Sequence, residues 1–220
     1  MNFTMRKELW LVASIGLALG VLPAKLLAQE ESPFESRFRL TSTTFANGTS
    51  MPISTINNYP VSPVNNTNSC SIDGSPGGNQ SPELSWTDAP RRTWTYVVTA
   101  YDVTAAFTHW GMYNIPANLT ELPLGAGAPG GHYGVQIVND NHAGVAEYDG
   151  PCPPPNFEPD VHDYVFTVYA LDIELKLPGS ANFPATAETL YRALIEAGKT
   201  HHILATATLT GLYSTTPPAI

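Results

Sequence analysis

The chain has 220 residues, a net charge of −9 at pH 7, 43% hydrophobic residues and two cysteines. This length suits one folded domain with a sizeable core. An acidic chain without a basic cluster disfavours nucleic acid and anionic membrane surfaces as partners.

The first 28 residues have the pattern of a secretory signal peptide. Arg6 and Lys7 precede an apolar run over residues 9–22, and Ala28 stands just before an acidic stretch. The apolar run is shorter than the ~20 residues that a membrane-spanning helix needs, so cleavage near Ala28 is favoured over a membrane anchor. We therefore expect a secreted or periplasmic protein with no stable membrane insertion after cleavage.

Residues 29–37 are polar and predict a flexible mature N-terminus, and residues 38–220 predict a single domain. The domain begins with an alternating, Thr-rich stretch at 38–45, which predicts a first strand. Residues 51–83 are crowded with Pro, Asn, Ser and Gly and predict a long irregular connection that ends in a short strand at 84–86. Such a connection inside a compact domain is usually functional or stapled.

The rest of the chain predicts further strands, separated by Gly- and Pro-rich turns, and one helix. The strands are rich in aromatic and β-branched residues, and the helix has apolar residues at helical spacing. We expect strands at 93–101, 109–115, 135–138, 165–171 and 203–213 and a helix at 185–197, with Ala187, Leu190, Tyr191, Leu194 and Ile195 on its apolar face and Gly198 as its stop. Many short strands with one or two helices predict a mainly β sandwich with helical additions.

Cys70 and Cys152 are both flanked by turn-forming residues. In an exported chain, two cysteines are most simply one disulfide. A bridge would tie the long early loop to the Gly/Pro turn at 149–154. Two free thiols are the alternative.

Polar groups stand at the ends of three predicted strands. Asp102 ends one strand and His109 begins the next, so both can lie at the same end of a sheet. His162 and Tyr164 precede a third strand and share a face if that strand extends to them. A carboxylate can fix one imidazole as a proton donor, and two imidazoles can then face an anion. Taken singly, Asp102 is equally typical of a turn and His109 of a structural histidine, but together they predict a pocket for phosphate or carboxylate.

Other chemistries have weaker support in the sequence. Two His and one Asp could hold zinc, but no tight His-x-x-x-His spacing is present, and we expect no metal and no cofactor. Ser-His-Asp hydrolysis lacks its Gly-x-Ser-x-Gly turn. His201 and His202 are expected to lead into the last strand, and His132 and His142 carry no specific signal.

An ordered set of motifs over residues 38–213 resembles the phosphatidylethanolamine-binding protein family, in its bacterial Raf kinase inhibitor-like branch. Each motif is weak alone, but their order is specific. In chain order they are Gly-Gly-Asn-Gln-Ser-Pro-Glu-Leu-Ser-Trp at 77–86, Tyr-Asp at 101–102, His-Trp at 109–110, Asn-Ile-Pro-Ala at 114–117, Leu-Pro at 122–123, Gly-Pro-Cys-Pro-Pro at 150–154, His-x-Tyr at 162–164 and Tyr-Ala-Leu-Asp at 169–172.

The resemblance implies a Greek-key β-sandwich of two antiparallel sheets with one or two peripheral helices. It also implies a small pocket that accepts phosphate, acetate or a phosphoryl headgroup. The implied ligand-binding residues are Asp102, Phe107, His109, Gly150, Pro153, Pro154, His162 and Tyr164. Exported members that resemble this chain also carry cysteines at the positions of Cys70 and Cys152.

One departure from the family pattern lies in the pocket's first loop. The family usually reads Asp-Pro-Asp-Ala-Pro there, whereas residues 102–106 read Asp-Val-Thr-Ala-Ala. Asp102 is kept, but both prolines and the second Asp are missing. We expect a less rigid and less polar loop, which leaves open whether the pocket keeps the family's headgroup or takes another ligand.

The favoured function is an exported binding module, with a regulatory role open, that captures a small anionic ligand. The alternative is a cofactor-independent isomerase or cyclase that uses Asp102, His109, His162 and Tyr164 as acid–base groups, since imidazole titrates near neutral pH. A kinase-inhibitor-like interaction is a third hypothesis, which an exported location disfavours. The sequence does not predict whether the chain is a monomer or a homodimer.

Overall fold

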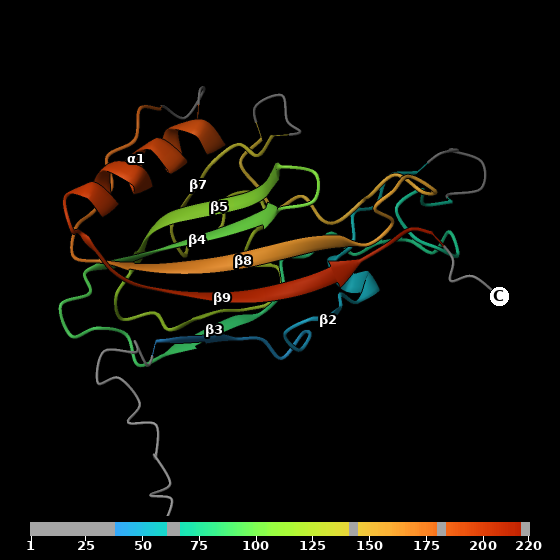
Figure 1. Ribbon diagram of the computed structural model, residues 1–220. Coiled ribbons are helices and arrows are strands. Elements are labelled where there is room, and N and C mark those ends of the chain that lie inside the picture. The colour runs from blue at the N-terminus through green and yellow to red at the C-terminus, as the bar shows by residue number, and fades with distance from the viewer. Residues whose placement is uncertain (1–37, 61–66, 141–144, 180–183, 217–220) are drawn as a thin grey trace, which may run out of the picture. The chain divides into compact units, whose positions relative to one another are not determined.

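Two β-sheets and one α-helix form three layers in the part of the chain that the structure, a computed structural model, describes (Figure 1). The described residues are 38–60, 67–140, 145–179 and 184–216. The predicted signal peptide, the predicted flexible N-terminus at 29–37 and His142 lie outside them.

The larger sheet has six strands in the order β2-β9-β8-β4-β5-β7. All its pairings are antiparallel except the two-residue pairing of β2 with β9, which is parallel. Its long central strands carry the β-branched and aromatic runs seen in the sequence. The bounds are β2 Thr49–Ser50, β4 Thr95–Asp102, β5 Phe107–Pro116, β7 Val135–Gln136, β8 His162–Leu171 and β9 Ile203–Tyr213.

The smaller sheet packs against one face of the larger one. It consists of β1 Arg39–Thr41, β3 Leu84–Thr87 and β6 Glu121–Leu122 in the order β1-β3-β6, all antiparallel. The core between the sheets includes Leu40 and Trp86 from the smaller sheet and Tyr96, Met112 and Phe166 from the larger. These side chains recur at every second position of their strands, as a half-buried pleated sheet requires.

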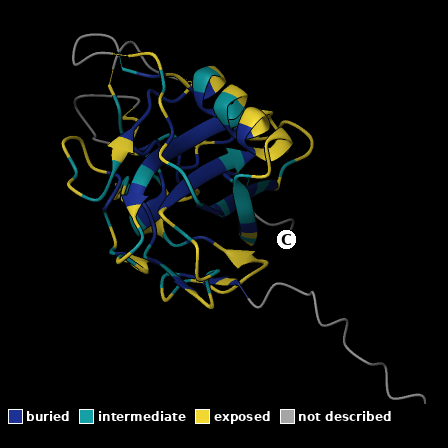
Figure 2. Cartoon of the chain, turned by 90° about the vertical axis from the view of Figure 1, so that its left-hand side faces the viewer, coloured by how far each residue is buried: buried dark blue, intermediate teal, exposed yellow. Residues whose placement is uncertain are grey.

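Helix α1, Ala187–Lys199, covers the opposite face of the larger sheet. Its buried residues Leu190 and Leu194 join Val97 of β4 and Leu171 of β8 in a second core. β4 is therefore buried on both faces, which explains its nearly continuous hydrophobic sequence. β4 and β5 are buried over most of their length, and Figure 2 shows dark blue strands behind a helix that is partly yellow.

The predicted architecture of a mainly β fold with two sheets and a peripheral helix is confirmed. The predicted end of the helix was wrong. Gly198 lies within α1, and His201 takes the left-handed conformation that closes a helix, with φ of 61°. Ile195, predicted on the buried face, is 58% exposed, and Ala197 is buried instead.

The predicted long irregular connection is irregular in the described parts of 51–83, apart from the short 3-10 helix Ile53–Thr55 and one bridge between Pro60 and Asn68. It lies against the end of the larger sheet where β4 ends and β8 begins. There it contacts the turn at 149–154, because the N–H of Asn57 donates to the Pro151 carbonyl over 3.1 Å.

Candidate functional site

The pairing of β4 with β8 brings three of the predicted site residues together. Asp102, the last residue of β4, is paired with Tyr164 of β8. His162 lies two residues before Tyr164 and therefore on the same face of the strand. β8 begins at His162, three residues earlier than predicted, which places both side chains within the strand.

A β-bulge turns His109 toward the same face. In the β4–β5 ladder Ala100 is paired with Trp110 and Tyr101 with Thr108, so His109 is an extra residue between them. In such a bulge two consecutive residues face one residue of the partner strand. His109 consequently reaches the Asp102 side of the sheet, and its ring centroid lies 5.1 Å from that of Tyr164.

The loop after Tyr148 forms the wall of the site that faces the strand residues Asp102, His162 and Tyr164. Its Gly150 lies so close to the early loop that an added Cβ would be 2.3 Å from the Thr55 carbonyl oxygen, so only glycine fits. The predicted disulfide between Cys70 and Cys152 is present and ties the two loops together. Cys152 stands two residues after Gly150 and contributes to the cavity wall.

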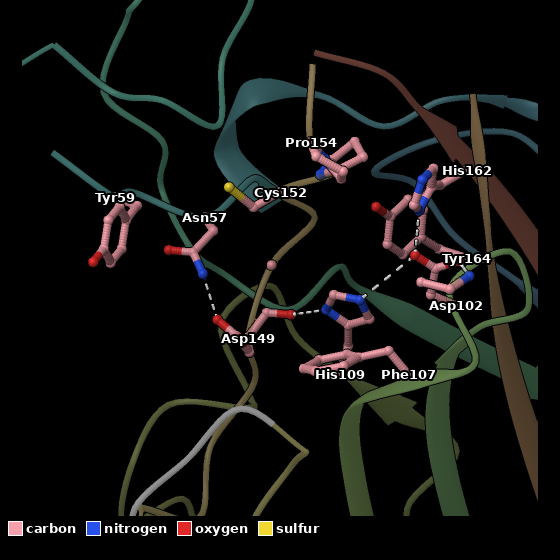
Figure 3. A pocket seen from close by; sticks show the side chains of 13 residues that line it. Asn57, Tyr59, Asp102, Phe107, His109, Asp149, Cys152, Pro154, His162 and Tyr164 are labelled. Atoms are coloured by element: carbon pink, nitrogen blue, oxygen red, sulfur yellow. Dashed lines mark hydrogen bonds and ion pairs between the residues drawn. The ribbon is translucent and has the colours of Figure 1, made fainter. Parts of the chain in front are cut away.

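These elements enclose a cavity of about 290 Å³ (Figure 3). All eight residues that the sequence analysis named as ligand-binding line it. The cavity is also lined by four residues that were not predicted as ligand-binding, namely Asn57, Tyr59, Ala105 and Asp149. Asn57 and Tyr59 come from the long irregular connection, whose length was the one signal that could have pointed to them.

Asp102 organises the floor of the cavity. Its Oδ2 atom lies 2.6 Å from Nδ1 of His162, and its Oδ1 atom accepts hydrogen bonds from the backbone N–H groups of Thr104 and Ala105 at 2.8 and 3.0 Å. The turn that lacks the family prolines is thus held by Asp102 itself. Asp102 and His162 are 2% and 6% exposed, so their contact is shielded from water.

His109 is fixed in one tautomer. Its Nδ1 atom lies 2.6 Å from the carbonyl oxygen of Asp149 and must carry the proton, since a carbonyl only accepts. Burial lowers the pKa of His109, although the nearby Asp149 opposes this effect. In the resulting neutral ring Nε2 is an acceptor, and it lies 4.0 Å from Oδ2 of Asp102.

Tyr164 supplies a hydroxyl group beneath the two imidazoles. The side chain is 2% exposed, and burial, together with the Asp102 carboxylate, raises the pKa of Tyr164 far above its ordinary value. The hydroxyl therefore remains protonated at physiological pH and can donate or accept a hydrogen bond.

The carboxylate of Asp149 also faces the cavity and accepts a hydrogen bond from the side-chain amide of Asn57. The described residues contain no cluster of three or more His, Cys, Asp or Glu side chains that could hold a metal ion. His202 pairs with Asp172 at the far end of β8, with 2.8 Å between His202 Nδ1 and Asp172 Oδ1.

Comparison with known proteins agrees with the fold. The family model for phosphatidylethanolamine-binding protein matches residues 41–214. YbcL of Escherichia coli is 38% identical over 148 residues, which cover 64% of this chain and 74% of YbcL. YbhB of the same organism is 34% identical over 152 residues, covering 64% of this chain and 85% of YbhB.

The crystal structure of YbcL, described as a member of the mammalian family, superposes with a TM-score of 0.61 and 30% identity, covering 80% of this chain and 98% of YbcL. A more distant relative, named "Putative lipoprotein LppC", comes from Mycobacterium tuberculosis and is 31% identical over 119 residues, or 53% of this chain and 56% of LppC.

Two packed β-sheets with a single peripheral helix are the architecture that this chain shares with the crystal structure of YbcL. The chain belongs to the phosphatidylethanolamine-binding protein family. Among the helices of its described residues, none has the length and apolar character needed to cross a membrane.

Proposed function

We propose that the chain is an exported binding protein whose cavity takes a small ligand with a phosphate or carboxylate group. The observation that carries this proposal is the placement of Asp102 between two histidines. Oδ2 of Asp102 lies 2.6 Å from His162 Nδ1 and 4.0 Å from His109 Nε2, within one cavity of ligand size.

The hydrogen-bonding capacity of these groups favours a ligand that both donates and accepts. Neutral His109 presents an acceptor at Nε2, and the Asp102 carboxylate is also an acceptor. His162 carries a donor on Nδ1 toward Asp102, and its protonated form would offer a second donor at Nε2. Dihydrogen phosphate, a singly charged phosphate monoester or a carboxylic acid has both a hydroxyl group and a free oxygen and suits this set.

The net charge of the cavity sets a limit on ligand charge. Asp102 and Asp149 both line it, so a ligand with two full negative charges meets two carboxylates. Protonation of one ligand oxygen removes part of this repulsion and supplies the donor for His109. We therefore expect phosphate-bearing ligands to bind as monoanions.

Export is the second part of the proposal. It is supported by the signal-peptide pattern of residues 1–28, by the disulfide between Cys70 and Cys152, which persists in oxidising compartments, and by the lipoprotein name of LppC. Mass spectrometry of protein recovered from the periplasm or medium tests it. A first residue near position 29 supports export with cleavage, and an intact Met1 on cytosolic protein rejects it.

Acid–base catalysis is the alternative function of the same groups. A neutral His109 can accept a proton, because burial lowers its pKa and keeps the ring unprotonated. Burial raises the pKa of Tyr164, which makes its hydroxyl a weaker acid, so Tyr164 would serve as a hydrogen-bond donor to the reacting group. Binding and catalysis differ in what happens to the ligand. A bound small molecule that is recovered unchanged after prolonged incubation favours binding, and a stoichiometric excess of product favours catalysis.

Thermal shift measurements test the binding proposal. Inorganic phosphate, phosphoethanolamine and acetate are added to wild type, to His162→Ala and to His202→Ala. His202→Ala is the control, because it removes a His–Asp contact with a similar N–O distance at the other end of β8. Stabilisation of wild type and His202→Ala, but not of His162→Ala, supports the site. Absence of any shift in wild type rejects it.

A further inference from the structure

A second cavity of about 290 Å³ lies on the other face of the two strands that carry Asp102 and Tyr164. Its walls come from β4 and β8 and from helix α1, which covers this face of the sheet (Figure 1). It is lined by two threonines, three tyrosines and two valines: Thr99, Tyr101, Val103, Val165, Thr167, Tyr169 and Tyr191. None of these residues lines the first cavity.

The strand register builds a flat, hydroxyl-bearing base. Thr99 of β4 is paired with Thr167 of β8, and Tyr101 is paired with Val165. Because side chains alternate along a strand, Tyr101 points away from the face of its neighbour Asp102. The two cavities are therefore separated by the thickness of the sheet.

Tyrosine rings form the sides of this second cavity. Tyr191 of α1 packs edge-on against Tyr101, with 6.1 Å between ring centroids and an interplanar angle of 76°. Tyr169, two residues beyond Thr167 on β8, contributes a third ring. A tyrosine offers an apolar face and a polar hydroxyl, a combination typical of binding surfaces.

The lining contains no charged side chain. Each threonine and tyrosine hydroxyl can donate one hydrogen bond and accept others. Burial raises the pKa of Tyr191 to about 12 and also raises that of Tyr169, so these hydroxyls stay neutral. A charged ligand would find no counter-charge here. The hydroxyl groups of Tyr169 and Tyr191 already interact with threonine hydroxyls, Thr99 among them, but each hydroxyl keeps capacity for a further hydrogen bond, which a neutral ligand with hydroxyl groups can use.

We propose that this cavity is a second ligand site and that it binds a neutral sugar ring. The carbon–hydrogen faces of a sugar ring would pack on the tyrosine rings, and its hydroxyl groups would exchange hydrogen bonds with Thr99 and Thr167. The proposal goes beyond the oxyacid site and does not depend on it, since the two sites share no lining residue.

The test uses three neutral disaccharides, cellobiose, maltose and N,N′-diacetylchitobiose, with the mature wild-type protein. Binding is followed by saturation-transfer NMR on the sugar and by amide chemical shifts on the protein. At least one sugar is expected to bind at millimolar concentration, with shifts concentrated at Thr99–Val103, Val165–Tyr169 and Tyr191. Affinity should be the same at mildly acidic and mildly alkaline pH, because no lining group changes charge in that range.

Variants locate the site. Thr167→Lys places a charged side chain across the base of the cavity, and Tyr191→Ala removes one wall from a different element. Both are expected to weaken sugar binding tenfold or more. Thr41→Lys, at an exposed position of β1 in the smaller sheet, is the matched control and should bind like wild type.

Two results would overturn the sugar site: no binding of any of the three sugars to wild type, or equal binding to wild type, Thr167→Lys and Tyr191→Ala. Binding that is lost in His162→Ala but kept in Thr167→Lys would assign the sugar to the first cavity and also reject the proposal. The sugar site and the oxyacid site can therefore fail separately.

Discussion

Nδ1 of His109 lies 2.6 Å from the carbonyl oxygen of Asp149, and the N–H of Asp149 donates in return to the carbonyl of His109 over 3.0 Å. This reciprocal contact joins β5 to the loop that the disulfide holds. It fixes the tautomer of His109, and it connects the covalent staple at Cys152, three residues later, to the chemistry of the cavity.

Removal of the disulfide should therefore affect both stability and binding. The double variant Cys70→Ser/Cys152→Ser is expected to lose about 2–5 kcal/mol in free energy of unfolding. It should also bind phosphate more weakly, because the loop that carries Asp149 and Pro153 is no longer tied to the early loop. Urea denaturation and calorimetric titration measure the two effects.

A double variant that is destabilised but binds phosphate with wild-type affinity would show that the loop keeps its place without the bridge. Titration of denatured, unreduced wild-type protein with a thiol reagent provides the control. It should find no free thiol, since Cys70 and Cys152 are bonded to each other and are the chain's two cysteines.

The buried His109 should make stability depend on pH. Its pKa in the folded protein lies below the ordinary value of 6.5, because burial disfavours the charged imidazolium. Between these two pKa values the unfolded chain binds more protons than the folded one. The contribution of neutral His109 to the free energy of unfolding should therefore be fully present above the ordinary pKa. It should be lost as pH falls from the ordinary pKa to the lower pKa of the folded protein.

The variant His109→Asn has no titrating group at this position and isolates the effect. Melting temperatures of wild type and variant are compared at neutral and at mildly acidic pH. Wild type should lose more stability on acidification than the variant. Equal losses would mean that His109 does not carry this pH dependence.

Several features of the site followed from the sequence because they depend on local patterns. The aromatic and β-branched run before Asp102 predicted a strand that ends at that residue, and β4 does end there. Period-two alternation predicted that His162 and Tyr164 share a face. The export pattern at the N-terminus and the turn-forming neighbours of Cys70 and Cys152 predicted a disulfide, which is confirmed.

Other features depend on long-range packing and left no local pattern. Strict alternation would place His109 and Trp110 on opposite faces, but the bulge in β5 lets His109 face the cavity. Asn57 reaches the site through the N–H bond to Pro151, a contact between segments far apart in the chain. The end of α1 at Lys199 was missed because His201, not a glycine, adopts the left-handed conformation.

The packing of α1 on the larger sheet gives a prediction that uses two glycines. A Cβ at Gly111 would lie 2.6 Å from Cδ1 of Ile137 and 2.8 Å from Cδ2 of Leu190, so Gly111→Ala should destabilise the protein by about 1–3 kcal/mol. At Gly198, within the helix, the nearest atom is 3.8 Å away. Gly198→Ala should stabilise by roughly 0.5–1 kcal/mol, since alanine favours helix.

Urea denaturation of the two variants measures both changes. Opposite signs are expected, and each variant serves as the control for the other. A neutral effect of Gly111→Ala would mean that the helix can move away from β5 at little cost.

Protonation of the ligand provides a prediction on the oxyacid site. Phosphate monoesters lose their second proton with a pKa of about 6. Because neutral His109 and the Asp102 carboxylate both accept hydrogen bonds, the affinity for phosphoethanolamine should fall as pH rises above this value. Calorimetric titration across this range checks the trend, and a rising affinity would contradict the assignment of His109 Nε2 as an acceptor.

Calorimetric titration of inorganic phosphate into wild type, His162→Ala and His202→Ala at mildly acidic pH tests the central claim most directly. We expect one saturable site per chain in wild type and His202→Ala, and at least a tenfold weaker affinity in His162→Ala. The absence of binding to wild type, or equal affinity in wild type and His162→Ala, would contradict it.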